Sequence, residues 1–306
     1  PGDADRTQLL RVADEPDENG RALTTRTLEG TLAVPGVAWD GTTSGLTSLG
    51  GRLVLIEPRE SFPRRSTRLV MVDTTSLRTV AELDLEGDYS FDAVSPDGGL
   101  IYLIHYLDPR DPSLYEVRAW DVAAERMLPE PIIDRRTAPE VMRGYPMTRA
   151  TSPDGEWEYT LYDGGGSKPF VHALNTASKT ALCIDLPSLD GRAVWNYGLE
   201  PSPDGSAVGI LNRKGVEVAS FTTSDWVATE SVPRVSSDEE DAGSADDRDA
   251  GEGALAWIVA GGALLVVVVA SWLLRRWRRQ RARKELPPDP FEEPKEPVER
   301  ERASSA

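Results

Sequence analysis

The sequence predicts an all-β fold, namely a small β-propeller of about four or five four-stranded blades. Three observations support this prediction, and the first is a repeated turn. The letters Ser-Pro-Asp-Gly occur at 95–98, 152–155 and 202–205. Their spacings of about 50 to 57 residues are close to the roughly 40 to 50 residues of a propeller repeat. Proline presets φ for a type I turn, serine can bond to the backbone ahead, and glycine suits the fourth position.

The turn residues are predicted to be structural rather than to form a set of functional carboxylates, because each holds the same position in its unit. They are Ser95, Pro96, Asp97, Gly98, Ser152, Pro153, Asp154, Gly155, Ser202, Pro203, Asp204 and Gly205.

The second observation is that each turn lies between strand-like runs rich in β-branched and aromatic residues. Around the second turn these runs are 145–151, 156–163, 170–176 and 180–186, and similar sets occupy 89–134 and 193–231. An earlier unit has a degenerate turn at 49–52, followed by runs at 53–57, 68–73 and 79–85. The third observation is that the third run of three units ends in a residue able to start a turn, namely Asp73, Asp121 and Asn175.

Four clear blades therefore fall within about 40–232. Residues 21–35 add one or two strands, either as part of a fifth blade or to complete the last blade and close the ring. A closed ring would leave only short, protected strand edges. An open array and a β-sandwich are the alternatives.

The repeated turns and the hydrophobic strands after them resemble the YVTN/WD40-like and TolB-like bacterial propellers. Met142–Gly155, together with 159–163 and 170–174, also resembles an uncharacterised group of actinobacterial exported, membrane-anchored propellers. The broader resemblance implies a binding or scaffolding module, whereas the narrower one implies no activity.

A membrane anchor is predicted at 254–274, where no residue is charged. At about 1.5 Å per residue this segment would span the roughly 30 Å of the hydrocarbon layer as a helix. Indole rings favour the membrane interface, and arginines mark the cytoplasmic side. The residues expected at the interface are Trp257, Trp272, Arg275, Arg276, Arg278 and Arg279.

This anchor divides the chain into segments with different expected locations. The expected order is a flexible N-terminal segment at 1–20, an extracytoplasmic propeller at 21–232, an acidic disordered stalk at 233–253, the anchor at 254–274 and a cytoplasmic tail at 275–306. Such an orientation implies that an N-terminal export signal has been removed. The net charge of the chain is −17, and the part before the anchor is strongly acidic, which argues against a nucleic-acid partner.

The sequence holds few residues with the spacing of a catalytic or metal site. The histidines are His105 and His172 and the one cysteine is Cys183, and none belongs to a zinc motif. A Cys183–His172 nucleophile pair is conceivable, but the apolar run 181–184 would raise the pKa of the thiol. The acidic segment 14–20 does not fit a calcium loop, and no serine-hydrolase elbow or phosphate loop is present. We therefore expect no catalytic residue, metal or cofactor, and a protein that is not an enzyme.

The expected function is recognition of an envelope ligand or protein partner at the loops of the propeller's axial face. Tyrosine and arginine are the usual contact residues of interfaces. The candidate rim residues are Tyr106, Arg110, Arg143, Tyr145, Arg149, Tyr162, Lys168 and Tyr197. The alternatives are a transmembrane signalling or regulatory subunit with the tail as its output, and a metal-dependent propeller enzyme of the lactonase or lyase kind.

Overall fold

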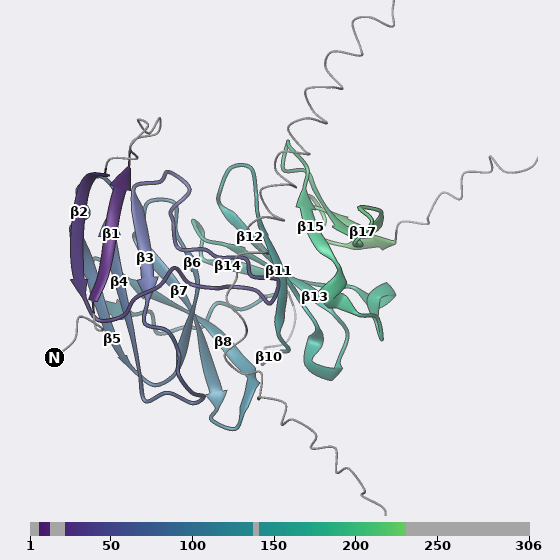
Figure 1. The fold of residues 1–306 in the computed structure, drawn as a ribbon. Helices are drawn as coiled ribbons and strands as arrows, with labels where there is room; N and C mark the ends of the chain where they lie inside the picture. Colours follow the sequence, from purple (N-terminus) through teal and green to yellow (C-terminus); the bar gives the residue numbers. More distant parts are fainter. Residues whose placement is uncertain (1–5, 13–21, 137–140, 231–306) are drawn as a thin grey trace, which may run out of the picture. The chain divides into compact units, whose positions relative to one another are not determined.

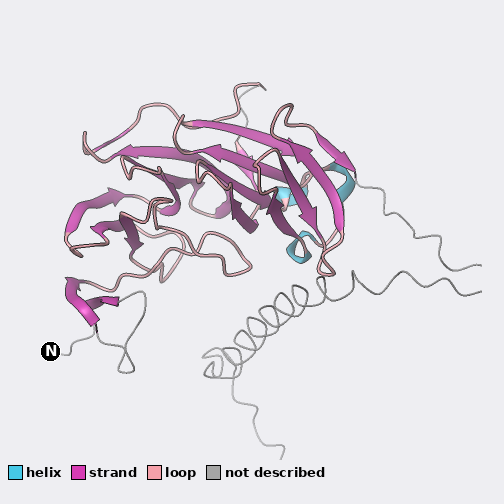
Figure 2. Cartoon of the chain, turned by 90° about the horizontal axis from the view of Figure 1, so that it is seen from above, coloured by secondary structure: helices cyan, strands magenta, loops and turns pink. Residues whose placement is uncertain are grey.

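The computed structural model describes residues 6–12, 22–136 and 141–230, and this part of the chain is all-β (Figure 1). Figure 2 shows that strands and loops make up nearly all of it, with three short 3-10 turns as the helical elements. No helix within these ranges is long and apolar enough to cross a membrane. The predicted stalk, anchor and tail, with Trp257, Trp272 and the arginine cluster, lie outside the described residues.

Four antiparallel sheets follow one another along the chain as the blades of a small β-propeller. Blade I consists of an inner segment at 44–47, β3 (Arg52–Ile56), β4 (Ser66–Asp73) and β5 (Thr79–Glu86). Blade II consists of β6 (Tyr89–Val94), β7 (Leu100–Asp108) and β8 (Asp111–Asp121), with β9 (Arg126–Met127) and β10 (Met142–Arg143) both paired to β8.

The last two blades are regular four-stranded sheets. Blade III consists of β11 (Pro146–Thr151), β12 (Trp157–Tyr162), β13 (Phe170–Asn175) and β14 (Thr180–Asp185). Blade IV consists of β15 (Gly198–Pro201), β16 (Ala207–Leu211), β17 (Glu217–Thr222) and β18 (Ala228–Glu230). In both sheets the strands pair in sequence order, as the spacing of the runs predicts.

The N-terminal strands pack against blade I instead of joining blade IV. β1 (Arg6–Val12) and β2 (Ala22–Glu29) form a separate two-stranded sheet, so residues 6–12 are a strand and not the flexible segment expected from the sequence. Leu28 and Leu32 pack with Leu55, Val70 and Val72 in one buried cluster. Within the described ranges, no hydrophobic cluster joins this hairpin to blade IV.

All three Ser-Pro-Asp-Gly turns share one hydrogen-bond pattern. In the first, the Leu100 amide donates to Ser95 Oγ (2.9 Å), Ser95 Oγ donates to Asp97 (2.6 Å), and the Gly98 amide donates to the Ser95 carbonyl (2.9 Å). The same bonds recur around Ser152 and Ser202. Each turn thus joins the first and second strands of a blade, where the sequence analysis placed it.

Blade I has the same turn two residues earlier than the degenerate turn predicted at 49–52. The Arg52 amide donates to Thr47 Oγ1 (3.1 Å), and the Gly50 amide donates to the Thr47 carbonyl (2.7 Å). Thr47 therefore takes the place of the turn serine, and the turn spans 47–50. Its proline and aspartate positions hold Ser48 and Leu49, which hides the repeat in the sequence.

The aspartates of the three turns give the fold an expected pH dependence. Hydrogen bonds from serine hydroxyls and backbone amides lower the pKa of Asp97 and Asp154, and lower that of Asp204 to about 2. The stabilisation of the fold by these ionised carboxylates is therefore complete above the unfolded-state pKa of about 3.9. It is lost as the pH falls through the pKa values of the folded protein. We expect the melting temperature of the D97N/D154N/D204N variant to fall less than that of the parent protein when the pH is lowered from about 4 to about 2. Equal losses in the two proteins would contradict this role.

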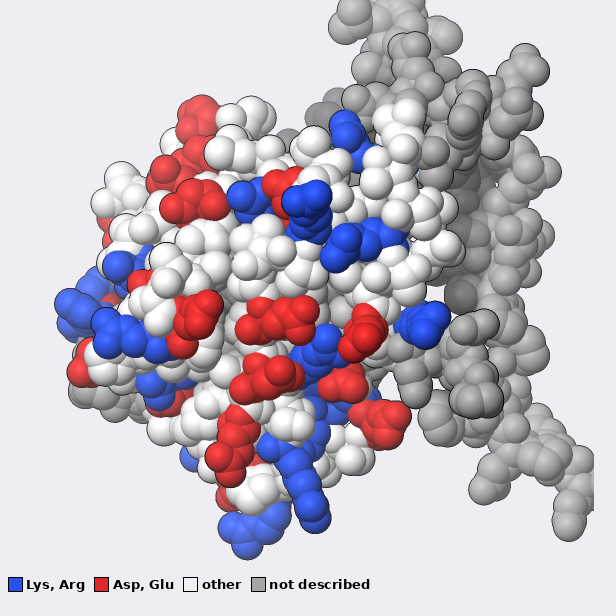
Figure 3. All heavy atoms as spheres, turned by 90° about the vertical axis from the view of Figure 1, so that its left-hand side faces the viewer, with Lys and Arg blue, Asp and Glu red and all other residues white. Residues whose placement is uncertain are grey.

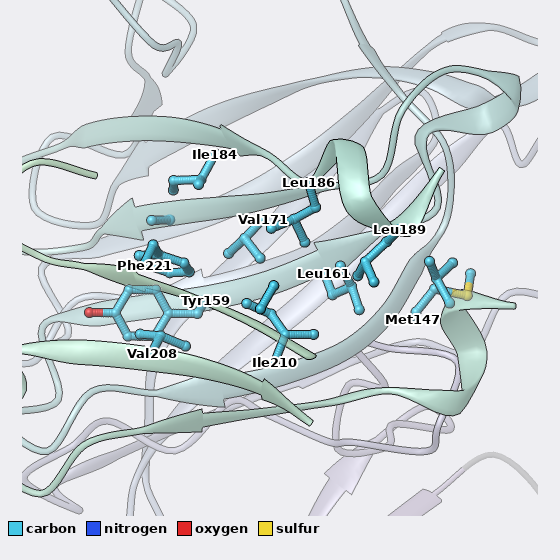
Figure 4. Close-up of a cluster of buried hydrophobic side chains, with 13 residues drawn as sticks. Met147, Tyr159, Leu161, Val171, Ile184, Leu186, Leu189, Val208, Ile210 and Phe221 are labelled. Carbon is cyan, nitrogen blue, oxygen red and sulfur yellow. The ribbon is translucent and has the colours of Figure 1, made fainter. Parts of the chain in front are cut away.

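Each pair of neighbouring blades encloses a hydrophobic cluster. The cluster between blades III and IV is drawn in Figure 4, where Tyr159, Leu161 and Val171 of blade III face Val208 and Phe221 of blade IV. Similar clusters join blades I and II and blades II and III. Strands such as β13 are buried on both faces because a different neighbour covers each face.

The inner parts of blades I and III meet directly. The amides of Trp39 and Asp40 donate to the carbonyls of Pro146 (2.8 Å) and Met147 (3.2 Å) at the free edge of β11. At the turns, a Cβ added to Gly155 would lie 2.3 Å from Ser48 Cβ. These contacts join blade III directly to blade I and to the segment just before it.

Candidate ligand cavity between blades II and III

A cavity of about 800 Å³ opens between blades II and III. Its blade II wall comes from β8, β10 and the segment 132–134, and its blade III wall comes from residues 166–168, β13 and β14. Ligand sites of small molecules commonly measure about 300 to 1,000 Å³. The cavity is therefore large enough for a small organic ligand.

His172 and Cys183 lie on the blade III wall because of strand register. They are direct partners in the β13–β14 pairing, so their side chains project from the same face of the sheet. This face also carries Phe170 and Leu174, which belong to the cluster shared with blade II. The Cys183 Sγ atom is 3.8 Å from His172 Nδ1.

The His172 imidazole is neutral at physiological pH. Burial lowers its pKa to about 4, outweighing the opposite effect of Asp92, while Arg149 also lowers it. Only 1% of the residue is exposed, and its Nε2 atom has no hydrogen-bond partner among the described residues. The nitrogen itself is covered by surrounding protein atoms.

Tyr115 lies on the blade II wall. The residue is 2% exposed, and its hydroxyl interacts with the hydroxyl of Tyr162. Burial, together with the neighbouring Tyr162, raises its pKa well above the usual value. The hydroxyl therefore keeps its proton and can donate it in a hydrogen bond.

Charged residues surround the mouth of the cavity. Glu116 is bound by Arg118 (3.0 Å), and Asp134 is bound by Arg136 (2.8 Å) and by the Cys183 amide (2.9 Å). Although burial opposes ionisation of Asp134, these bonds lower its pKa. Four exposed lining residues have no ion pair within the described part of the chain, namely Arg143, Lys168, Asp185 and Asp190.

A buried ion pair lies beside the cavity. Arg149 of β11 donates to both the carboxylate and the carbonyl of Asp92 in β6, and its Nε donates to Thr160 Oγ1 (2.8 Å). The side chains are 4% and 1% exposed. This pair connects the innermost strands of blades II and III, so it holds the two walls of the cavity together.

The eight predicted rim residues do not form one site. Arg143 and Lys168 line the cavity, whereas Arg149 and Tyr162 are buried in the interface and cannot act as exposed rim residues. Tyr106 stacks under Arg59, with 4.8 Å from the guanidinium to the ring centroid, and Tyr197 packs on the cluster between blades III and IV. Arg110 and Tyr145 are exposed and lie outside the cavity lining.

Sequence reasoning missed Tyr115 as a lining residue, and it considered His172 only as a conceivable partner of Cys183, without placing it in a cavity. One feature of the sequence could have indicated His172: it is a histidine within the otherwise apolar run 170–174, a pattern typical of a strand buried on both faces. No group of three or more histidine, cysteine, aspartate or glutamate side chains that could hold a metal occurs among the described residues.

No protein-family model and no curated protein sequence matches the chain. Among solved structures, TolB from Acinetobacter baumannii is similar at 16% identity and a TM-score of 0.37, over 75% of this chain and 53% of that one. A puromycin-hydrolyzing peptidase from Mycobacterium tuberculosis is similar at 14% identity and a TM-score of 0.38, over 62% of this chain and 29% of that one. The β-propeller domain of the Trilobed protease from Pyrococcus furiosus is similar at 10% identity and a TM-score of 0.33, over 55% and 47%.

These similarities concern the β-propeller fold alone. This chain spans about half the length of TolB. They contradict the prediction that the protein is not an enzyme, because the similar structures include a peptidase. A missing sequence motif is therefore no argument against an activity. The narrower resemblance to an actinobacterial group has no counterpart among these structures.

Proposed function

We propose that this propeller is a recognition module that binds a small ligand in the cavity between blades II and III. One observation carries the proposal: an open cavity of about 800 Å³ is lined by exposed charged residues that have no ion pair within the described part of the chain. These residues are Arg143, Lys168, Asp185 and Asp190. A charged ligand in the cavity would give them partners.

The charges of the surface favour a specific site over broad electrostatic attachment. On the face drawn in Figure 3, basic and acidic side chains are interspersed. This face therefore has no extended region of one sign that would attract a polyanion. The unpaired charges at the mouth of the cavity are better suited to orienting a small charged ligand.

We expect a panel of small carboxylic acids, amines and neutral sugars to contain ligands detectable by saturation-transfer NMR. The R143A/K168A variant should bind charged ligands more weakly, whereas R110A, which alters an exposed arginine outside the cavity, should bind them like the parent protein. Absence of binding by every class, or equal weakening in R110A, would refute the site. Analysis of the same samples for reaction products tests whether a bound molecule is also a substrate.

We further propose that residues 254–274 anchor the propeller on the extracytoplasmic side of the membrane. The support is the uncharged span, with an acidic segment before it and an arginine cluster after it. A chain ending at residue 253 should appear in the soluble fraction, while the full chain should remain in carbonate-washed membranes. Retention of the shortened chain would contradict the anchor, and truncation after Lys284 tests whether the tail has a signalling output.

A further inference from the structure

The exposed charges that line the cavity gather at one end of it. On the blade III wall, β13 begins at Phe170 and β14 ends at Asp185, and these two residues are partners in the antiparallel pairing. The start of β13 and the end of β14 therefore lie at the same edge of the sheet. Lys168 comes just before this edge and Asp190 follows it in the turn after β14, and both line the cavity.

Arg143 comes from blade II but lies at the same end of the cavity. A Cβ added to Gly165 would be 3.5 Å from Arg143 Cβ, so the glycine loop that precedes Lys168 rests against this arginine. Within the described ranges, none of the four exposed charged lining residues has an ion pair. The mouth of the cavity thus presents two cationic and two anionic side chains.

Apolar surface adjoins these charges on the blade II wall. Ile133, Val141 and Met142 line the cavity and form what is here termed its apolar wall. Val141 is 49% exposed, and the other two residues are partly exposed. The remaining acidic lining residues, Glu116 and Asp134, already have arginine partners. An apolar wall beside a charged mouth matches a ligand that has an apolar part and a charged part.

We propose that the cavity binds a single-chain amphiphile with a zwitterionic head group, whose alkyl chain packs on the apolar wall. The anionic part of the head group, a phosphate or sulfonate, pairs with Arg143 and Lys168, and its ammonium part pairs with Asp185 and Asp190. A head group of one sign would meet two like charges at the mouth, which would weaken its binding. This inference rests on the proposed function and deepens it by naming the class of ligand.

Occupancy of the cavity is measured at Cys183, which lines it and is the one cysteine of the chain. The reagent is methyl methanethiosulfonate, which is small and uncharged. It transfers its methylthio group to the cysteine sulfur and releases methanesulfinate, so a ligand in the cavity should slow the reaction. The full chain is held in vesicles of phosphatidylglycerol, whose head group is not zwitterionic.

Three probes separate the head group from the chain: octylphosphocholine, octyl maltoside and glycerophosphocholine. Octylphosphocholine should protect Cys183 at a concentration at least tenfold lower than either of the others, because it alone supplies both the zwitterion and the alkyl chain. Each methylene that is buried against the apolar wall should raise the affinity roughly fourfold.

Two double variants test the charges of the mouth. R143A/K168A and D185N/D190N should each weaken protection by octylphosphocholine roughly three- to tenfold, and leave the weaker protection by octyl maltoside unchanged. The matched control is R110A, which removes an exposed arginine outside the cavity and should behave like the parent protein. Equal weakening in R110A would contradict pairing of the head group at the mouth.

The apolar wall is tested by V141S, which should weaken protection by octylphosphocholine but not by glycerophosphocholine. Its control is V80S, because Val80 is a 43% exposed valine of blade I outside the cavity. The inference is overturned if octylphosphocholine protects no better than octyl maltoside, or no better than glycerophosphocholine; in either case the cavity remains a binding site. If Cys183 does not react in the folded chain without ligand, the cavity is closed and the proposed function itself is refuted.

Discussion

Replacing Arg149 with methionine is expected to lower the free energy of unfolding by about 3–5 kcal/mol, because it leaves the Asp92 carboxylate buried without its counter-ion. Methionine fills much of the space of the arginine side chain, so the loss reports charge more than volume. Asp92 is 1% exposed and has no route to water as compensation. Urea-induced unfolding, followed by tryptophan fluorescence, measures the change.

Two further variants separate the ion pair from general disruption of the interface. D92N/R149M removes both charges and should recover a substantial part of the stability lost in R149M, since no unpaired charge remains. R110A breaks the ion pair between Arg110 and Asp108. The Arg110 side chain is 88% exposed, so this variant should leave the unfolding midpoint unchanged. If the double variant were less stable than R149M, the pair would not be the cause.

Gly155→Ala should destabilise the protein more than the same substitution in the equivalent turn of blade IV. Both glycines have positive φ, +73° at Gly155 and +72° at Gly205, so alanine costs about 1–2 kcal/mol at either position. At Gly155 the new methyl group would also lie 2.3 Å from Ser48 Cβ, whereas at Gly205 the nearest atom is 3.9 Å away. We expect the overlap to cost a further ~1–3 kcal/mol, as overpacking of a core does.

Gly205→Ala is thus the control for backbone strain, and a second substitution tests the contact itself. Removing the Ser48 side chain in S48G/G155A should bring the stability loss close to that of Gly205→Ala. Thermal unfolding of the four proteins, including the parent, is sufficient for the comparison. Equal destabilisation by the two alanine variants would show that blade I does not press on this turn.

The repeated turns made most of the fold predictable from the sequence. The runs predicted at 156–163 and 180–186 agree with β12 and β14 to within one residue at each end, because proline, glycine and aspartate mark their boundaries. The outer strand of blade II closes the set of runs predicted at 89–134. In the structure this strand, β9, ends at Met127, since Pro129 and Pro131 lack the amide proton that pairing requires.

The cavity could not be predicted in the same way. After β9, the outer segment of blade II meets β8 at single points, Leu128 and Ile132, before β10 pairs with it at Met142. No local sequence pattern encodes this arrangement. The facing of Tyr115 and His172 depends on how two separate sheets pack. The prediction that arginine and tyrosine residues mark the binding rim was a poor guide to the cavity. Arg149 and Tyr162 lie in strands, and a neighbouring blade buries their side chains.

The contact between the inner parts of blades I and III has a consequence for biosynthesis. The amides of Trp39 and Asp40 have their partners at Pro146 and Met147, roughly 100 residues later in the chain. Domains form as their chain emerges, so residues 39 and 40, just before blade I, must wait for these partners until β11 of blade III has been made. The blades therefore cannot be completed one at a time in the order of synthesis, and a chain released before residue 155 would expose an unfinished centre to aggregation.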